Sequence, residues 1–472
     1  MAFELLSPEE VEALHLATLR ILEETGIVLT EPRSRTLLAD AGARLAEGRV
    51  YLPPQLVEAC IALAGKQVSI RGRGGAVKTL GDGRLYFHNL GGAPYVYDSA
   101  SGKRRLAVVQ DVRDATRLLD ALENCHTITP FFTPTDVPGS IMSLAMYRYA
   151  LPHTLKPLQG PGVQYAAEAR YAVRMAEVIG EPDEVLTLAL SPVSPLTIPE
   201  HEALAIIEIA RLGISFAPLP CPTAGTTAPF TIAGAVAQQN AEVLAALVLA
   251  ELVHPGLPII YCGRLAMMEP RSGLSVWGGV ELSLASAATV QIGHYYGLPV
   301  NVYGFSTNAH SLDAQDGFER ALNAALPALA GADELSGIGE MDAGVMGSFT
   351  QMVADNEFAS SILRLRQGVQ ADEETLAVDV VAAAMNGTRN FLAQRHTMKH
   401  LKAGELLLTH LAERGSWESW DAGGRQGMVE RAQAQAEQIL QQHQVPPLEP
   451  AQERELDALL RAAESELTGG PQ

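Results

Sequence analysis

The chain has 472 residues, of which 47% are hydrophobic, and it carries a formal net charge of −20. This length exceeds one small domain but suits a single barrel domain with extensions. The negative charge argues against nucleic acid as a partner, because affinity for that polyanion comes mainly from lysine and arginine. A local basic pocket for a small anion is still compatible with the composition.

The sequence predicts a cytoplasmic protein without a membrane partner. The most apolar run, residues 232–253, is interrupted by glutamine, asparagine and glutamate, unlike a membrane span. The acidic start MAFELLSPEEVEAL lacks the basic region of a secretion signal. The cysteines are widely spaced, which favours reduced thiols over a metal site: Cys60, Cys125, Cys221 and Cys262.

Residues 1–84 are predicted to form N-terminal helices and short strands. Ser7 is a suitable N-cap, Pro8 suits the first helical position, and Glu10 completes a capping box. The later stretch VSIRGRGGAVKTLGDGRLYF has the glycine punctuation that is typical of short strands and turns. We expect this region to precede the catalytic core rather than to form part of it.

Residues 85–365 alternate short apolar runs with amphipathic stretches. The runs include LYFHNLGG, TLALSPVSPL, PIIYCGRL and VNVYGFSTNAH. Strands that alternate with helices favour a parallel sheet, and about eight such units are the number that closes a TIM (β/α)₈ barrel. The predicted class is therefore α/β, with a barrel as the catalytic domain. An open doubly wound sheet is the main alternative, weakened because no GxGxxG motif follows an early strand.

Residues 366–472 form the last predicted region, a C-terminal helical extension. Polar helical stretches such as ERAQAQAEQILQQHQ and AQERELDALLRAAESEL dominate it. We expect this extension to pack on the barrel and to end in a frayed tail, TGGPQ.

Functional groups of a barrel lie at the carboxyl ends of its strands. Each predicted strand here ends in polar residues, glycine or proline before its helix begins. The connection GFSTNAHSLDAQDGFE, residues 304–319, is the most polar of these. It is interpreted as pocket lining, with an ordinary solvated loop as the alternative.

Several separate blocks resemble the trimethylamine methyltransferase family. They are PTAGTTAPFTIAGAVAQQNAEVLAALVLAEL, DAQDGFERALNAALPALAGADELSGIGEMD and MVADNEF, with GGAPYVYDSASGKRR and LKP upstream and FLAQRHT downstream. The resemblance implies a TIM barrel that moves a methyl group from a methylated amine to the cobalt of a separate corrinoid protein. Because the chain has only standard residues, it is similar to the non-pyrrolysine branch, whose known substrates are quaternary amines such as glycine betaine.

The leaving group supports a quaternary substrate. A quaternary ammonium departs as a neutral tertiary amine without needing a proton, whereas trimethylamine must first be made cationic or activated. We therefore expect a methyltransferase that uses a glycine betaine-like amine. The alternatives are another TIM-barrel enzyme, such as a lyase or a zinc-assisted transferase, and a non-catalytic betaine-binding protein.

An aromatic cage is the expected binding device, because each aromatic face contributes ~0.5 to 2 kcal/mol of cation–π attraction. Core packing is the alternative for any single ring. The candidates at predicted strand ends are Tyr95, Tyr97, Phe131, Phe132, Tyr261, Tyr303, Phe305 and Phe349.

Strand alternation narrows the choice of inward-facing residues. Asn301, Tyr303 and Phe305 share one face, which we expect to point into the barrel. On the preceding strand, Arg264 lies on the face opposite Tyr261 and offers a planar fork for a carboxylate. A structural salt bridge is the alternative for Arg264.

The family's DAQ…E block corresponds here to Asp313, Gln315 and Glu319. The resemblance implies that Asp313 and Gln315 lie at the pocket rim, where substrate and corrinoid meet, as catalytic and corrinoid-contacting residues. Glu319 is expected to be structural. His310 is a further candidate for substrate binding. A zinc site that joins it to Cys221 and Cys262 is disfavoured, because their spacing is loose.

The corrinoid is expected to come in trans from a partner protein. The chain shows no DxHxxG block of the kind that ligates cobalt, so no corrinoid should be tightly bound and the purified protein should be colourless. The other expected partner is a second copy of the chain, as a homo-oligomer.

Overall fold

The first region folds into helices and short strands in the computed structural model, which describes residues 3–469. α1 (Pro8–Arg20) begins at the predicted capping box. The Glu10 N–H donates to the Ser7 hydroxyl at 3.3 Å, and the Ser7 N–H donates to the Glu10 carboxylate at 2.8 Å. The region continues with a π-helix (Ile21–Thr25), β1 (Ile27–Val28), α2 (Pro32–Asp40), β2 (Arg44–Ala46), β3 (Arg49–Tyr51), α3 (Pro54–Leu63), β4 (Val68–Arg71) and β5 (Val77–Leu80).

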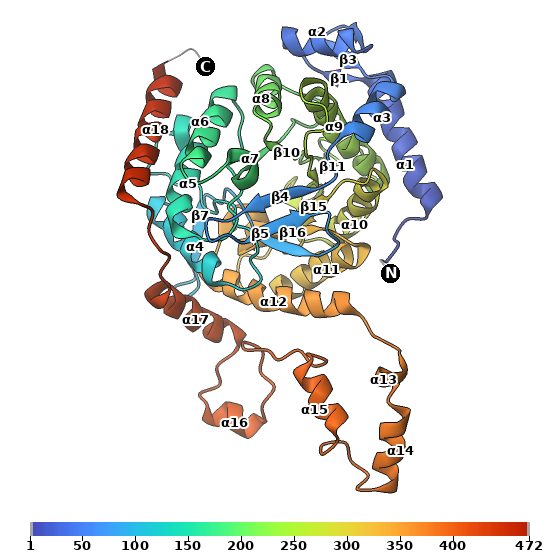
Figure 1. The fold of residues 1–472 in the computed structure, drawn as a ribbon, viewed down its shortest axis with the longest axis vertical. Helices are drawn as coiled ribbons and strands as arrows, with labels where there is room; N and C mark the ends of the chain where they lie inside the picture. The colour runs from blue at the N-terminus through green and yellow to red at the C-terminus, as the bar shows by residue number, and fades with distance from the viewer. Residues whose placement is uncertain (1–2, 470–472) are drawn as a thin grey trace.

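Parallel strands form the centre of the protein, with helices around them (Figure 1). One sheet has the order β12-β15-β16-β6 and a second has the order β10-β9, and all of these pairs are parallel. Their apolar residues belong to the buried core. The strands are β6 (Tyr86–Asn89), β9 (Thr187–Leu190), β10 (Ser215–Pro218), β12 (Tyr261–Gly263), β15 (Val300–Tyr303) and β16 (Glu334–Ile338).

Single parallel bridges connect these sheets through two further segments. They run from His88 to Thr127, from Ile128 to Leu158, from Gly162 to Ala189 and from Phe216 to Ile259. The predicted α/β class is confirmed. The parallel strands form two separate sheets, however, and only single bridges join them. The described chain therefore does not form one continuous closed barrel sheet.

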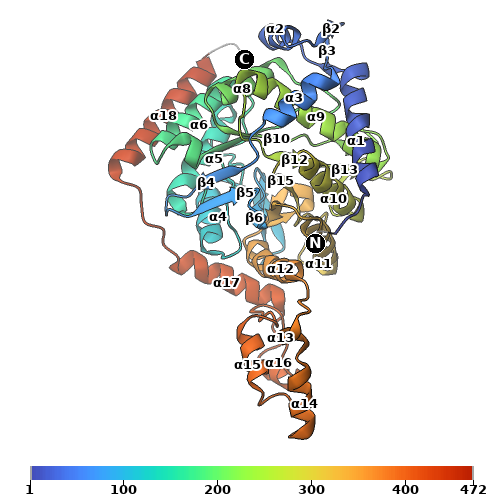
Figure 2. The ribbon, with the colours of Figure 1, turned by 45° about the vertical axis from the view of Figure 1, so that its right-hand side comes forward.

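Helices between the strands surround the sheet (Figures 1 and 2). α9 (Ile232–Val253) is the one described helix long and apolar enough to cross a membrane, but 78% of its most apolar window is buried inside the protein. The others are α4 (Val109–Ala121), α5 (Met142–Ala150), α6 (Ala166–Glu177), α7 (Pro182–Val185), α8 (Glu200–Arg211), α10 (Val280–Tyr295), α11 (Ala314–Ala330) and α12 (Phe349–Gln367). Short 3₁₀ turns at Gly139–Ile141, Leu151–His153 and Asp342–Gly344 complete this part.

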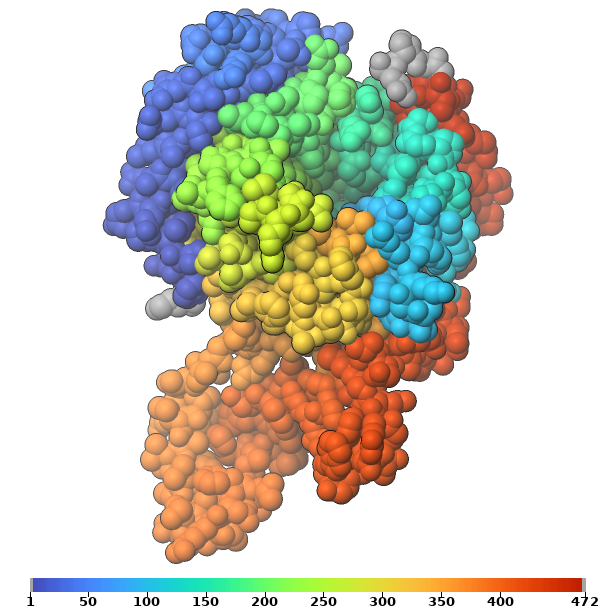
Figure 3. Space-filling model, turned by 180° about the vertical axis from the view of Figure 1, so that it is seen from behind, coloured from blue at the N-terminus to red at the C-terminus, as the bar shows by residue number. Residues whose placement is uncertain are grey.

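Short hairpins follow several strands at their carboxyl ends and frame the mouth of the central sheet. Figure 3 shows this face, hollowed between the blue segment that holds β7 and β8 and the yellow-green segment that holds β13 and β14. The short strands around the mouth are β7 (Tyr95–Asp98), β8 (Lys103–Leu106), β11 (Thr223–Ala224), β13 (Ala266–Met268), β14 (Ser275–Val276), β17 (Glu340–Met341) and β18 (Met346–Gly347).

The C-terminal extension packs on the central domain mainly through its last two helices, and Glu357 on α12 also accepts from the N–H groups of His410, Leu411 and Ala412. α17 (Met428–Gln442) lies against α12 and α4, and α18 (Pro450–Gly469) lies against α5 and α6. Residues 368–427, here called the arm, project away from the domain (Figures 1 and 2). The predicted frayed tail lies partly outside the described residues. The arm contains α13 (Glu373–Leu376), α14 (Val378–Asn386), α15 (Arg395–Lys402) and α16 (Trp417–Ala422).

A buried charge cluster joins α11, α12 and β17 below the mouth. Arg320 is fully buried and pairs with Asp316 at 2.6 Å and with Asp355 at 3.0 Å. Glu340 accepts from the Ser306 hydroxyl at 2.6 Å, while its other carboxylate oxygen is buried without a partner in the described chain. Burial raises the pKa of Glu340 and that of Asp355 to about 7, because one guanidinium does not neutralise three carboxylates.

This cluster predicts that the free energy of unfolding depends on pH. Glu340→Gln should reduce that dependence. A carboxyl whose pKa is raised by folding contributes stability that is fully present below its unfolded pKa of about 4.3. That stability is lost as the pH rises through the folded pKa of about 7. We expect the variant to lose less stability than the wild type between these limits, by ~1 to 3 kcal/mol.

Thermal unfolding across this pH range measures the difference, with the exposed Glu437→Gln as the matched control. Parallel pH profiles for Glu340→Gln and the wild type would contradict a protonated Glu340 in the folded chain.

Candidate functional site

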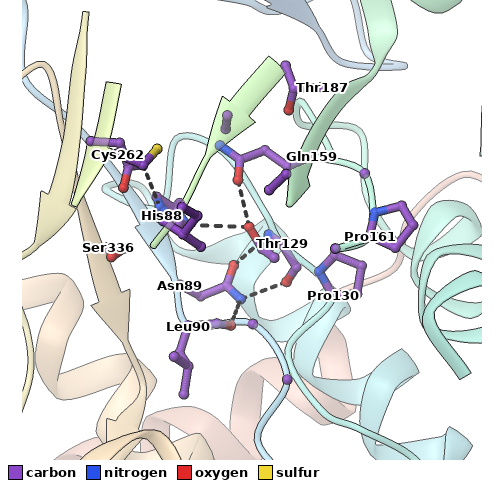
Figure 4. A pocket seen from close by; sticks show the side chains of 18 of the residues that line it. His88, Asn89, Leu90, Thr129, Pro130, Gln159, Pro161, Thr187, Cys262 and Ser336 are labelled. Carbon is purple, nitrogen blue, oxygen red and sulfur yellow. Dashed lines mark hydrogen bonds between the residues drawn. The ribbon is translucent and has the colours of Figure 1, made fainter. Parts of the chain in front are cut away.

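A cavity of about 330 Å³ opens at the carboxyl ends of the central strands (Figure 4). Each side of its wall comes from a different strand end, as the fold requires. Its polar lining is His88, Asn89, Thr129, Ser143, Gln159, Thr187, Cys262, Arg264, Asn301, Tyr303 and Ser336.

An ion pair lies beneath this cavity. Lys78 on β5 donates to Glu334 on β16 at 2.6 Å, and both side chains are buried. Burial alone would raise the pKa of Glu334, but Lys78 and the hydrogen bond from Asn301 lower it to about 2. Glu334 therefore stays ionised and neutralised by Lys78. The first region of the chain thus contributes to the site, contrary to the expectation that it only precedes the core.

Hydrogen bonds extend from this ion pair along the cavity wall, and Figure 4 draws those among His88, Thr129 and Gln159. Asn301 Nδ2 lies 2.5 Å from Glu334 and 2.9 Å from His88 Nε2. The other ring nitrogen of His88 lies 3.3 Å from the Thr129 hydroxyl, which donates to Gln159 at 2.8 Å. Because burial lowers the pKa of His88 to about 4, its ring is neutral, and this network assigns the proton to Nδ1.

Arg264 is a buried cation without a carboxylate partner. It is 5% exposed, and within residues 3–469 no acidic oxygen lies in ion-pair range of it. Its guanidinium donates at 3.0 Å to the carbonyls of Gly263 and Asn301, and also to the Asn301 side chain. It lies over the Tyr303 ring, 4.5 Å from the centroid, and Trp277 packs edge-on against that ring. A guanidinium has five N–H donors, so donors remain for a ligand in the cavity.

The structure brings three predicted site residues together at the cavity: Arg264, Asn301 and Tyr303. Asn301 and Tyr303, which strand alternation placed on the inward face of β15, both line the cavity. Tyr261 points away, as strand alternation indicated, and its hydroxyl donates to Asn240 at 2.7 Å.

The predicted aromatic cage is not assembled in this cavity. Phe131 and Phe132 pack on each other with centroids 4.6 Å apart, and Phe349 packs on Phe132 at 5.8 Å. A Cβ at Gly347 would lie 2.1 Å from Phe131. The rings therefore occupy the space that a side chain at Gly347 would need. The cause is core packing, the alternative noted for each ring.

The remaining candidates also lie outside the cavity lining. Phe305 packs on Phe87, with centroids 5.6 Å apart. Tyr95 and Tyr97 lie on β7, where Arg104 covers Tyr95 at 4.6 Å. His310 is 79% exposed and pairs with Asp342 at 3.0 Å.

The DAQ…E block caps a helix. Asp313 is the exposed N-cap of α11 and accepts from the N–H groups of Gln315 at 2.9 Å and Asp316 at 3.2 Å. Gln315 donates to Glu319 at 2.9 Å, and Glu319 also accepts from Thr307 at 2.6 Å and from the Asn308 N–H. Neither Asp313 nor Gln315 lines the cavity. Their contact with a corrinoid stays a prediction.

The cysteines are free thiols. Cys262 lines the cavity, and burial raises the pKa of its thiol to about 12. Within the described residues, no group of three or more histidine, cysteine, aspartate or glutamate side chains is arranged to hold a metal ion.

Sequence reasoning missed the polar network: Lys78, His88, Thr129, Gln159 and Glu334. His88 lies in the run LYFHNLGG, which the sequence predicts as a strand, so its position along the chain was a usable signal. Lys78 and Glu334 belong together only through pairing across 256 residues of chain. No local pattern carries that information.

The capping geometry predicts a stability cost for Asp313→Ala. Loss of an N-cap carboxylate costs ~0.5 to 2 kcal/mol, whereas Asp313→Asn should retain most of the stability because asparagine also caps well. Thermal unfolding of both variants measures this effect. If Asp313→Ala unfolds like the wild type but transfers methyl at least about tenfold more slowly, the residue acts at the rim rather than as a cap.

The whole chain matches known methyltransferases. The model of the family described as trimethylamine methyltransferase (MTTB) matches residues 1–468. The trimethylamine methyltransferase MttB of Desulfitobacterium hafniense strain DCB-2 is 30% identical over 452 residues, covering 94% of this chain and 90% of that protein. The glycine betaine methyltransferase of strain Y51 is 29% identical over 469 residues, covering 98% and 96%.

A solved structure shares the fold. The hydroxylamine complex of MtmB matches with a TM-score of 0.50 at 12% sequence identity, covering 98% of this chain and 92% of that chain. The family resemblance found in the sequence blocks is therefore confirmed over the full length: this chain belongs to the trimethylamine methyltransferase family.

Proposed function

We propose that the protein transfers a methyl group from a quaternary amine that carries a carboxylate, of the glycine betaine type, to the cobalt of a corrinoid protein. Arg264 is the observation that carries this proposal. A buried guanidinium is costly unless an anion compensates it, and the cavity it faces is where a substrate carboxylate would supply that charge. Trimethylamine has no carboxylate and would leave Arg264 uncompensated.

The cavity residues bind and orient the substrate. Tyr303 and Asn301 hold the guanidinium of Arg264 in place, so its free donors keep one direction without substrate. During transfer the bond between the methyl carbon and nitrogen breaks, and its electron pair stays on nitrogen. The product is a neutral tertiary amine, so the leaving group needs no proton from neutral His88.

The mouth suits a corrinoid supplied in trans. When bound, that group supplies a cobalt nucleophile for the methyl carbon. Lys103, Arg104 and Arg105 lie exposed on β8 in a hairpin at the carboxyl end of β6. Arg104 pairs with Asp342 and Arg105 with Asp111, so Lys103 is the residue of the three that leaves an unpaired positive charge at this edge of the rim in the described chain. Such an edge favours an anionic partner surface.

We also propose that the ring of parallel segments within residues 85–365 be classed as a (β/α)₈ barrel.

Methyl transfer to cob(I)alamin tests the function. The wild type should convert glycine betaine to the tertiary amine only when reduced corrinoid is present. Arg264→Met should lower kcat/KM by at least about tenfold, or ~1.4 kcal/mol. The absorbance change of the corrinoid and the tertiary amine formed are measured together.

Arg170→Met, an exposed arginine on α6, is the matched control and should leave kcat/KM unchanged. Tertiary amine formed without corrinoid would overturn the proposed acceptor. Tight binding of betaine without turnover in the presence of reduced corrinoid would favour the non-catalytic binding protein instead.

We infer that the arm docks on a second copy of the chain. Twelve large apolar side chains of the arm are between 41% and 91% exposed, among them Val378, Val381 and Met385 along one face of α14. Permanent homo-oligomer interfaces are apolar, like a domain core cut in half, whereas transient ones are more polar. A methyl acceptor must leave after each turnover, so the apolar arm suits a permanent partner.

The arm predicts that the purified chain is an oligomer. Val381→Glu combined with Met385→Glu should shift it toward the monomer, because two charges would enter an apolar interface. Light scattering after size-exclusion chromatography measures the mass. Leu16→Glu, at an exposed position on α1, is the control. A wild type that is monomeric at micromolar concentration would contradict the inference.

A further inference from the structure

A second chamber of about 340 Å³ adjoins the main cavity at the mouth. It lies between the N-terminal ends of α6 and α8, beside β9. The two hollows share a stretch of wall, so they lie side by side at the mouth. The shared residues are Ser143, Met146, Gly162, Ala189 and Leu219.

Glu202 on α8 lines this side chamber and has no counter-charge. It is 6% exposed, and its Oε2 atom is buried without a hydrogen-bond partner in the described chain. Burial raises the pKa of its carboxyl to about 7. An unpaired buried carboxylate is costly, so it either holds a proton or receives a cation from outside.

The other carboxylate of the chamber, Glu168, is fully engaged in hydrogen bonds within the protein. Glu168 on α6 accepts from the Ser143 hydroxyl at 2.8 Å and from the N–H groups of Gln164 and Tyr165 at 2.7 and 3.0 Å. It therefore caps α6, and its charge is already solvated by the protein. Glu202 has no such role, although it occupies the corresponding end of the neighbouring helix.

The remaining wall suits a group that makes no hydrogen bonds. Met142, Met146, Val163, Leu190 and Leu219 contribute apolar surface, and thioethers adapt well to irregular ligands. A quaternary ammonium has no N–H donor, so methyl groups contact such a wall while the positive charge needs only a nearby anion. A primary ammonium would leave its donors unpaired against these side chains.

We propose that Glu202 is the counter-ion of the substrate's quaternary ammonium, which lies in the side chamber while the substrate's carboxylate binds Arg264. The two uncompensated charges of the mouth are of opposite sign and border adjacent hollows that share part of their walls. A zwitterion neutralises both at once, whereas a methylamine or a simple carboxylate neutralises one. The identity of the substrate rests on the proposed function.

Two half-ligands test this proposal without corrinoid or turnover. Tetramethylammonium carries only the cationic end, and 3,3-dimethylbutanoate carries only the carboxylate, with an uncharged tert-butyl group in place of the ammonium. Calorimetric titration of the full chain should show that Glu202→Gln lowers the affinity for tetramethylammonium at least about tenfold. The affinity for 3,3-dimethylbutanoate should be unchanged. Arg264→Met should do the reverse.

Glu202→Gln keeps the side-chain shape and removes a buried charge, so the variant should fold. Glu200→Gln, at an exposed position on the same turn, is the control. Absence of tetramethylammonium binding in the wild type, or equal binding by Glu202→Gln, would overturn the inference. Glu202-dependent binding by a chain that fails to demethylate betaine would overturn only the proposed function.

Discussion

The ion pair between Lys78 and Glu334 is the contact on which the rest of the site depends. It neutralises the buried carboxylate of β16, which in turn holds Asn301 through a 2.5 Å hydrogen bond. Asn301 then accepts from Arg264. Because Glu334 is satisfied by Lys78, Arg264 keeps its charge for the cavity. Without Lys78, the charge of Glu334 would be buried without a cation, which is costly.

Separated charges suit methyl transfer better than one strong cage. The charge on nitrogen disappears during the reaction, so contacts that hold the ammonium too tightly stabilise the substrate more than the transition state. The carboxylate of a betaine does not change charge, and Arg264 can bind it equally throughout. Glu202 is then the one anionic contact proposed for the reacting end. Tyr303 is the one predicted cage residue that lines the cavity.

The sequence predicts the class of fold and the face that carries the site, because hydrophobic periodicity and strand-end composition are local. It predicts Arg264, Asn301 and Tyr303 by strand alternation. It fails for the phenylalanines, since a ring at a strand end looks the same whether it faces a ligand or fills the space above Gly347. Asp313 caps α11 in the folded chain, and its role at the rim stays a prediction. The role of Lys78 depends on its contact with Glu334, and that of Glu202 on the lack of a hydrogen-bond partner. Both are visible only in the folded chain.

The central claim is that the cavity binds a carboxylate through Arg264, and a crystal structure of the chain with a bound betaine tests it most directly. The account predicts both carboxylate oxygens within hydrogen-bond distance of the Arg264 guanidinium, with the methyl groups directed toward Glu202. A betaine whose carboxylate binds elsewhere in the mouth, with Arg264 still turned toward Asn301 alone, would contradict the account.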